Sequence, residues 1–166
     1  TAKLRVLTED LLALSRLDSG AERPDPSDID VASVLHADYP TSGELVPRAG
    51  EGAVVHCDAG HLDRILANLV GNARKYGEAP ILVEADRVGD EVVLTVRDHG
   101  PGSPPAEVDT LFDRFRRGMS SAGQEGSGLG LAIVRELVRV NGGTVTQRTP
   151  EGGGACFEVR LPAATA

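Results

Sequence analysis

The chain has 166 residues, enough for one domain or one domain with an arm, and 40% hydrophobic with 25% charged residues is typical of soluble globular proteins. Its formal net charge of −8 disfavours general nucleic-acid binding, which depends on a basic surface. Aromatic residues make up only 3%, so the core has to be aliphatic. No apolar run approaches the roughly 20 residues that span a bilayer, and the distant Cys57 and Cys156 are expected to be buried, reduced thiols.

The first predicted helix covers residues 1–18 and carries leucines at intervals of three and four residues. They are Leu4, Leu7, Leu11 and Leu14. This a/d stripe is typical of a helix that packs into a bundle or coiled coil. A glycine and two prolines within residues 20–26 then end the helix. We therefore expect a helical arm at 1–19, a linker at 20–29 and a main domain at 30–166.

The main domain mixes helical and strand patterns. The expected helices are 30–38 (with Asp30 as N-cap), 60–76, 105–115 and 130–140. The expected strands are a short buried one at 53–57 and two hairpins, 81–98 across Gly89-Asp90 and 143–161 across "PEGGG", with residues 39–52 as loop or poor strand. This order predicts an α+β fold, a two-layer sandwich whose helices cover one face of a mixed, mostly antiparallel sheet.

A glycine-rich stretch, "EGSGLGLAIV", places Gly126, Gly128 and Gly130 at the start of the last predicted helix. Free N–H groups and a partial positive charge at a helix start favour an anion such as phosphate. The stretch lacks the G-x-G-x-x-G spacing after a strand that binds dinucleotides, and it lacks the Gly-Lys-Ser/Thr ending of a Walker A loop. It therefore predicts a phosphate site of another kind.

Polar side chains share one side of the helix predicted at 60–76. Asn68, Asn72 and Lys75 stand at i, i+4 and i+7, and Tyr76 borders them. Amide oxygens suit Mg²⁺, and a lysine supplies a point charge for phosphate. The alternative is that these amides only make hydrogen bonds between helices or to loops.

Asp98 opens the loop "DHGPG", in which Gly100 and Gly102 follow it. A partly buried aspartate can accept a hydrogen bond from an exocyclic amine such as that of adenine. The alternative is that Asp98 only shapes a turn.

Three arginines stand out in this acidic chain, within the segment "LFDRFRRG". They are Arg114, Arg116 and Arg117. The last of them begins a small, polar stretch, residues 117–128, which we expect to be a mobile lid. The arginines could reach phosphates from that lid or form a solvated basic face.

Together these segments resemble the catalytic ATP-binding domain of bacterial sensor histidine kinases, a branch of the GHKL ATPase superfamily. "NLVGNARKY" is similar to the N box, "DHGPG" to the G1 box, "LFDRFRRG" to the F box, "GSGLGLAIV" to the G2 box and "GGGACFEVRLP" to a G3 box. Their order and spacing agree over residues 58–162. The segment "DLLALSRLDSG" resembles the end of the second helix of the dimerisation domain, which would be residues 1–19 here.

The resemblance implies that the main domain binds ATP and Mg²⁺. Asn72 would coordinate Mg²⁺ with support from Asn68, while Lys75 and Arg117 would contact phosphates. Tyr76 would border the adenine ring, and Asp98 would bind its amine. The remaining ATP-binding positions implied are Gly100, Gly102, Gly126, Gly128, Leu129, Gly130 and Leu131.

The chain departs from the family pattern at two positions. His99 stands where Asn is usual, and its side chain is expected to point away as an exposed loop histidine. Ala155 replaces a usual hydroxyl residue, which removes a water-mediated contact to adenine.

Asn68 stands where ATP-hydrolysing relatives carry a glutamate general base. Because an amide cannot take a proton from water, Asn68 favours phosphoryl transfer to a protein over hydrolysis.

None of the chain's four histidines lies in the H box that carries the phosphoacceptor. They are His36, His56, His61 and His99. The resemblance therefore implies a fragment that donates the γ-phosphate to a histidine on a dimerisation domain outside it, for transfer to a response regulator. The full-length protein is expected to be a homodimer, with this part as the cytoplasmic domain of a membrane-anchored sensor. The alternatives are an anti-sigma-type serine kinase and a degenerate module that binds a partner without nucleotide.

Overall fold

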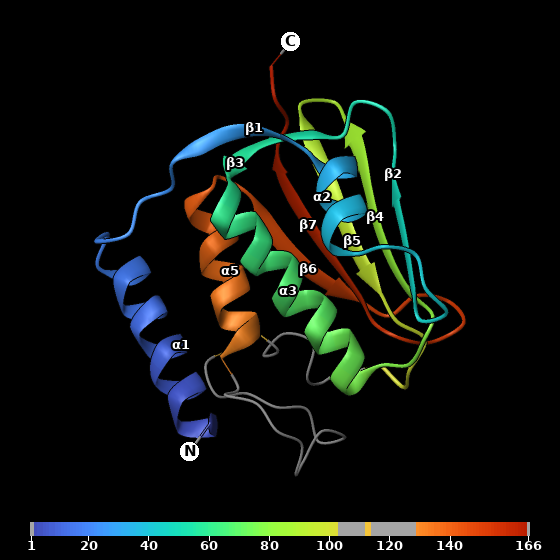
Figure 1. Cartoon of the computed structure of the whole chain (residues 1–166), viewed down its shortest axis with the longest axis horizontal. Helices are drawn as coiled ribbons and strands as arrows, with labels where there is room; N and C mark the ends of the chain where they lie inside the picture. Colours follow the sequence, from blue (N-terminus) through green and yellow to red (C-terminus); the bar gives the residue numbers. More distant parts are fainter. Residues whose placement is uncertain (1, 103–111, 114–128, 166) are drawn as a thin grey trace.

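The computed structural model describes residues 2–102, 112–113 and 129–165 (Figure 1). The helices in these ranges are α1 (Ala2–Asp18), α2 (Val31–Asp38), α3 (Ala59–Tyr76) and α5 (Gly130–Val140). The strands are β1 (Pro26–Asp30), β2 (Leu45–Ala49), β3 (Val54–Asp58), β4 (Ile81–Val88), β5 (Glu91–Arg97), β6 (Thr144–Arg148) and β7 (Cys156–Pro162). None of the described helices is long and apolar enough to cross a membrane.

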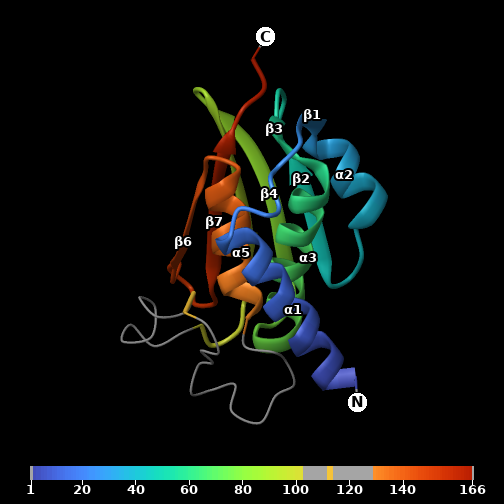
Figure 2. The same ribbon diagram turned by 90° about the vertical axis from the view of Figure 1, so that its left-hand side faces the viewer.

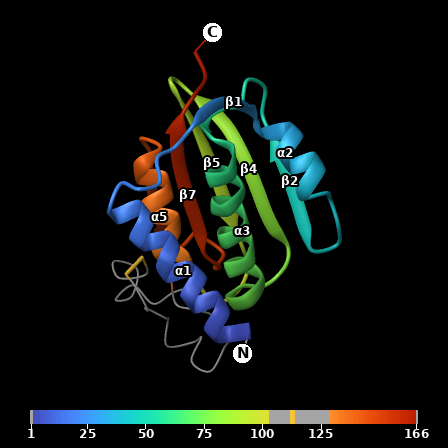
Figure 3. The ribbon, with the colours of Figure 1, turned by 60° about the vertical axis from the view of Figure 1, so that its left-hand side comes forward.

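The molecule has two layers, a sheet and the helices that cover one of its faces (Figures 2 and 3). The main sheet has five strands in the order β2-β4-β5-β7-β6, and only the β2–β4 pair is parallel. A separate antiparallel pair, β1–β3, meets the chain after β7 through a bridge between Val55 and Ala163. This arrangement confirms the predicted α+β sandwich with a mixed, mostly antiparallel sheet.

The core between the two layers is almost entirely aliphatic, as the low aromatic content requires. The strands β4, β5 and β7 alternate buried with half-exposed residues along their central parts, so each turns one face to the helices. The helix α3 buries its apolar residues at intervals of three and four, which are Leu62, Ile65, Leu66, Leu69, Val70 and Ala73. These side chains hold the polar side of α3 in a fixed orientation.

Most predicted elements are confirmed, but one strand was not anticipated and another lies in a stretch that the sequence left open between loop and poor strand. Both hairpins, the helices at 60–76 and 130–140, and the short helix after Asp30 are present. The linker interpretation of residues 20–29 missed β1, and the stretch interpreted as loop or poor strand contains β2. Asp30 occupies the N-cap position, yet its carboxylate accepts the Ser33 hydroxyl at 2.8 Å instead of a helix N–H. The helix predicted at 105–115 lies almost wholly outside the described residues.

Asp58 joins the start of α3 to the chain that precedes β1. Its Oδ1 accepts the His61 N–H at 3.0 Å as the N-cap of α3, and its Oδ2 accepts the Asp25 N–H at 2.8 Å. Desolvation alone would raise the pKa of Asp58, but the hydrogen bonds from Asp25 and His61 outweigh it, so the pKa lies below its usual value. This carboxylate therefore stabilises the fold at neutral pH through two backbone donors.

We expect Asp58→Ala to lower the free energy of unfolding by about 1–2 kcal/mol, because it removes an N-cap and a second acceptor. Because the pKa is lowered on folding, this stabilisation is complete above the ordinary aspartate pKa of about 4 and is lost as the pH falls through the lowered value. Urea denaturation at pH 7 measures the change, and Asp63→Ala, at an exposed position of the same helix, is the control. Equal losses of unfolding free energy in the two variants would contradict the role of Asp58 as N-cap and backbone acceptor.

Both cysteines are buried and unpaired, as the sequence predicted. Desolvation raises the pKa of the Cys57 thiol to about 12, helped by the nearby Asp58 carboxylate, and burial also raises the pKa of Cys156. Because the thiolate is the nucleophile, we expect the folded chain to resist iodoacetamide at pH 8. Mass spectrometry should find both thiols alkylated only after unfolding in urea, and labelling at equal rates in the two states would contradict this prediction.

Candidate functional site

The site predicted around Asp98 is built where three loops meet. They are the loop after α3 (77–80), the loop that begins after β5 (98–102) and the loop before β7 (149–155). The Asp98 N–H donates to the Ala155 carbonyl at 3.0 Å, and the His99 N–H donates to the Glu78 carbonyl at 2.9 Å. The backbone of the middle loop is thus fixed on both sides.

The Asp98 carboxylate is buried, with 4% of its surface exposed. Its Oδ1 accepts the N–H groups of Gly100 at 2.9 Å and Ala155 at 3.3 Å. No described residue donates to Oδ2. Because the carboxylate as a whole is buried and its Oδ2 has no donor among the described residues, Oδ2 is a suitable acceptor for a ligand's N–H group.

Glycines make room for this carboxylate. A Cβ at Gly77 would collide with the Asp98 side chain, and a Cβ at Gly154 would collide with the Asp98 carbonyl. A Cβ at Gly100 would lie 2.8 Å from the Gly77 Cα. Gly102 has a φ of 72°, and a Cβ there would lie 2.7 Å from the Gly154 carbonyl oxygen. The glycines at 100 and 102 are therefore required by close backbone approach.

The polar side of α3 faces the start of α5. The Asn68 Nδ2 donates to the Gly130 carbonyl at 3.4 Å, which brings the predicted N-box and G2-box residues together. The Asn72 amide is half-buried and has no hydrogen-bond partner among the described residues. Lys75 is exposed and Tyr76 is half-buried one turn further along. Asn72 therefore offers an amide oxygen that the described fold does not use.

The start of α5 also leaves backbone donors available. Leu129 occupies the N-cap position, is fully buried, and makes no side-chain cap. Among the described residues, no side chain caps the N–H groups of the first turn, from Gly130 and Leu131 onward, and the helix dipole adds partial positive charge there. This end of α5 suits an anionic group.

Ten of the predicted site residues lie on α3, in the Asp98 loop and at the start of α5. The structure joins α3 to α5 through the Asn68–Gly130 hydrogen bond, and it joins the loop after α3 to the Asp98 loop through the His99–Glu78 hydrogen bond. The other three predicted positions, Arg117, Gly126 and Gly128, lie outside the described residues, as does the predicted lid. The expected exposure of His99 was wrong, because its ring is half-buried and the Nδ1–H donates to the Pro80 carbonyl at 2.6 Å. Sequence reasoning also missed Gly77, whose contact with Asp98 appears only in the folded chain.

A family model and named relatives match most of this chain. The family model of histidine kinase-, DNA gyrase B- and HSP90-like ATPases matches residues 57–165. The histidine-protein kinase AfsQ2 of Streptomyces coelicolor is 40% identical over 98% of this chain, which covers 31% of that kinase. The sensor protein KdpD of Escherichia coli is 45% identical over 68% of this chain and 13% of its own length.

Solved structures of histidine kinases also match this chain. The full-length crystal structure of ShkA in complex with AMPPNP is 30% identical, with a TM-score of 0.82 over 96% of this chain and 36% of that chain. The present chain thus spans about a third of the length of AfsQ2 and of ShkA. It belongs to the family of histidine kinase-, DNA gyrase B- and HSP90-like ATPases, on the branch of the sensor histidine kinases.

Proposed function

We propose that this chain is the ATP-binding catalytic part of a two-component sensor histidine kinase. It binds Mg-ATP and donates the γ-phosphate to a histidine on a dimerisation domain. The observation that carries the proposal is the buried Asp98 carboxylate, which has one oxygen saturated by backbone donors and the other available to a ligand. The uncapped start of α5 and the polar side of α3 supply the complementary groups for phosphates and metal.

The base end of the site selects adenine. Asp98 Oδ2 accepts a hydrogen bond, so it favours the exocyclic amine at position 6 of adenine and disfavours the carbonyl that guanine carries there. Gly100 and Gly102 keep the Asp98 loop close to the loops on either side of it. Tyr76, half-buried at the end of α3, borders the ring.

The phosphate end uses charge and backbone donors. Asn72 would hold Mg²⁺, which neutralises phosphate charge when bound, and its amide has no described partner that would compete. Lys75 and Arg117 would contact phosphate oxygens. The first N–H groups of α5, at Gly130 and Leu131, would do the same, together with the backbone of Gly126 and Gly128.

The residue at position 68 favours transfer over hydrolysis. The Asn68 amide donates to the Gly130 carbonyl, so its role is to hold α3 against α5 and to support the metal site. An amide cannot act as general base for an attacking water. This favours a protein side chain as the acceptor, and the similarity of the chain to named histidine kinases supports histidine.

The partners follow from the same assignment. The acceptor histidine lies on a dimerisation domain, of which α1 is the C-terminal part of the second helix, and the phosphate then passes to a response regulator. The full-length protein is a homodimer anchored at the membrane, with the present chain on the cytoplasmic side.

Two measurements test the proposal. Isothermal titration with ADP and Mg²⁺ should show binding, and its absence would leave only the nucleotide-free interaction module. Incubation with labelled ATP and a dimerisation domain of a related sensor kinase that includes the H box should then give an acid-labile, base-stable phosphoprotein. An acid-stable phosphoserine would identify the anti-sigma-type serine kinase instead.

A further inference from the structure

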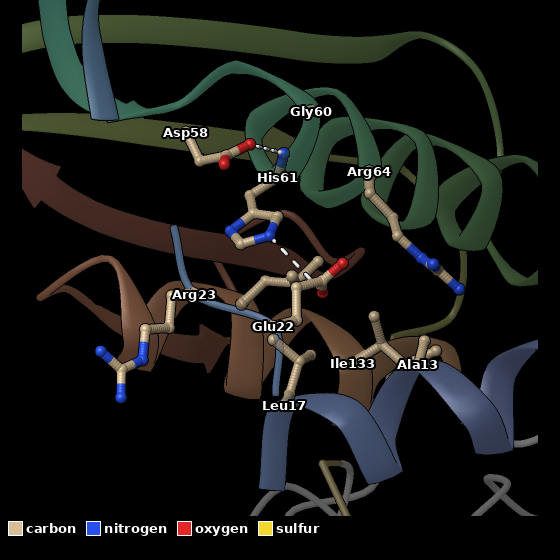
Figure 4. Close-up of a pocket in the computed structure, with 10 residues that line it drawn as sticks. Ala13, Leu17, Glu22, Arg23, Asp58, Gly60, His61, Arg64 and Ile133 are labelled. Atoms are coloured by element: carbon tan, nitrogen blue, oxygen red, sulfur yellow. Dashed lines mark hydrogen bonds and ion pairs between the residues drawn. The ribbon is translucent and has the colours of Figure 1, made fainter. Parts of the chain in front are cut away.

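The two ends of the helix α3 are fixed by different contacts. At its start, the Asp58 carboxylate accepts the His61 N–H at 3.0 Å (Figure 4). At its end, the chain turns at Gly77 into the loop 77–80, and this loop is bound by His99. The side chains that are proposed to meet metal and phosphate lie on the second half of α3. Their place relative to the adenine end of the site therefore depends on the loop 77–80.

His99 binds the loop 77–80 with its backbone and with its side chain. Its N–H donates to the Glu78 carbonyl at 2.9 Å, and its ring Nδ1 lies 2.6 Å from the Pro80 carbonyl oxygen. Because a carbonyl oxygen can only accept, Nδ1 carries the proton and is the donor. One residue thus joins the loop that follows α3 to the loop that follows β5.

The register of β4 and β5 shows what the His99 ring adds. Leu82 lies opposite Arg97, so continuing the same register by two residues places Pro80 opposite His99. A proline has no N–H to donate to a partner strand, so the ladder cannot continue through this pair with its full set of hydrogen bonds. The ring of His99 supplies a hydrogen bond beyond the point where the ladder ends.

The loop 77–80 lies directly against the Asp98 carboxylate. A Cβ added to Gly77 would lie 2.6 Å from Asp98 Oδ2, the oxygen that has no donor among the described residues. The other oxygen, Oδ1, is held by the N–H of Gly100 in the same loop and by the N–H of Ala155 in the loop before β7. The position of Oδ2 is therefore set from two directions, by these backbone donors and by the end of α3.

We propose that His99 is a positioning residue, whose ring donor holds the end of α3 against Asp98 and so sets the distance between the adenine acceptor and the groups for metal and phosphate. The inference rests on the proposed function, because both ends of the site have to meet one nucleotide. A fixed distance lets the nucleotide make both sets of contacts without the entropy loss of ordering the loops. Without the ring donor, the loop 77–80 is less firmly held, and the contact of Asp98 with the adenine amine weakens.

The ring donor can be kept or removed by substitution. Asparagine carries an N–H donor on an atom bonded to Cγ, as histidine does at Nδ1, so His99→Asn can donate to the same carbonyl. Leucine carries a carbon in that place, so His99→Leu fills the space without a donor. His99→Ala removes the ring without adding bulk and is the second donor-free variant. The matched control is His36→Leu, at an exposed position of α2.

Isothermal titration with ADP and with purine riboside 5′-diphosphate, each with Mg²⁺, measures the preference for the amine at position 6, which the second nucleotide lacks. The unchanged chain should prefer ADP. His99→Leu and His99→Ala should bind ADP roughly tenfold more weakly and purine riboside 5′-diphosphate with little change, so their preference falls. His99→Asn and His36→Leu should keep the preference within about twofold. Because both nucleotides meet the same protein, a loss of folded chain affects both titrations equally and leaves the preference unchanged.

Full preference for ADP in the two donor-free variants would overturn the role of His99. An equal loss of preference in His99→Asn would overturn the role of its donor, and an equal loss in His36→Leu would show that the effect is not specific to position 99. Absence of ADP binding to the unchanged chain would instead overturn the proposed function, and this inference with it. Failure of the inference alone is therefore distinguishable from failure of the proposed function.

Discussion

Replacing Asp98 by asparagine should weaken ADP binding by roughly 10- to 100-fold, the range expected when a hydrogen bond to a charged group is replaced by an unfavourable contact. The asparagine Oδ1 can still accept from Gly100 and Ala155, which leaves its NH₂ group in place of the free Oδ2. A donor then faces the adenine amine, which is also a donor. Isothermal titration of the two proteins with ADP and Mg²⁺ measures the loss.

The nucleotide itself provides the control for this prediction. Purine riboside 5′-diphosphate lacks the amine at position 6, so it should bind the unchanged chain about as weakly as ADP binds Asp98→Asn. The variant should discriminate little between the two nucleotides. If Asp98→Asn lost affinity equally for both, the aspartate would only be shaping its loop, which is the alternative that the sequence left open.

Regular, periodic elements were predictable from the sequence because their own residues determine them. The helix α3 has apolar residues at every third or fourth position, and the hairpin β4–β5 alternates around a glycine turn at Gly89 with a φ of 66°. Each pattern requires burial of one face, whatever lies opposite. Their bounds in the structure follow the predictions within one or two residues.

The strands β1 and β2 could not be predicted in the same way. The sequence of β1, "PSDID", is acidic and mostly exposed, and β2, "LVPRA", contains Pro47. Both lie at sheet edges, where one side needs no ladder partner and a proline is tolerated. Their strand conformation depends on β3 and β4, which are distant in the sequence, so local propensity carries little information about it.

The candidate site also has one part that the sequence could predict and another that it could not. Helical spacing alone placed Asn68, Asn72 and Lys75 on one side of α3, and the structure adds the contact of Asn68 with Gly130. The loops around Asp98 were different, because the hydrogen bond between His99 and Pro80 and the close approach of Gly77 join segments about 20 residues apart. No periodicity relates such segments, so their contacts emerge only when the strands are paired.

The Asn72→Ala variant should remove the magnesium dependence of ADP binding. With Mg²⁺ present its affinity should fall about tenfold or more, to the value that both proteins show in EDTA, because the amide oxygen that holds the metal is lost. In EDTA the two proteins should bind ADP equally. Titration with and without Mg²⁺ gives both comparisons.

Stability separates a metal ligand from a structural amide at this position. No described residue hydrogen-bonds to Asn72, and alanine has the higher helix propensity, so Asn72→Ala should unfold at the same or a slightly higher urea concentration. The matched variant Asn68→Ala loses its contact with Gly130 and should be less stable. A structural role for Asn72 would give lower stability and a loss of ADP affinity that persists in EDTA. A metal-binding role gives unchanged stability and a loss confined to magnesium, so the two measurements together decide between them.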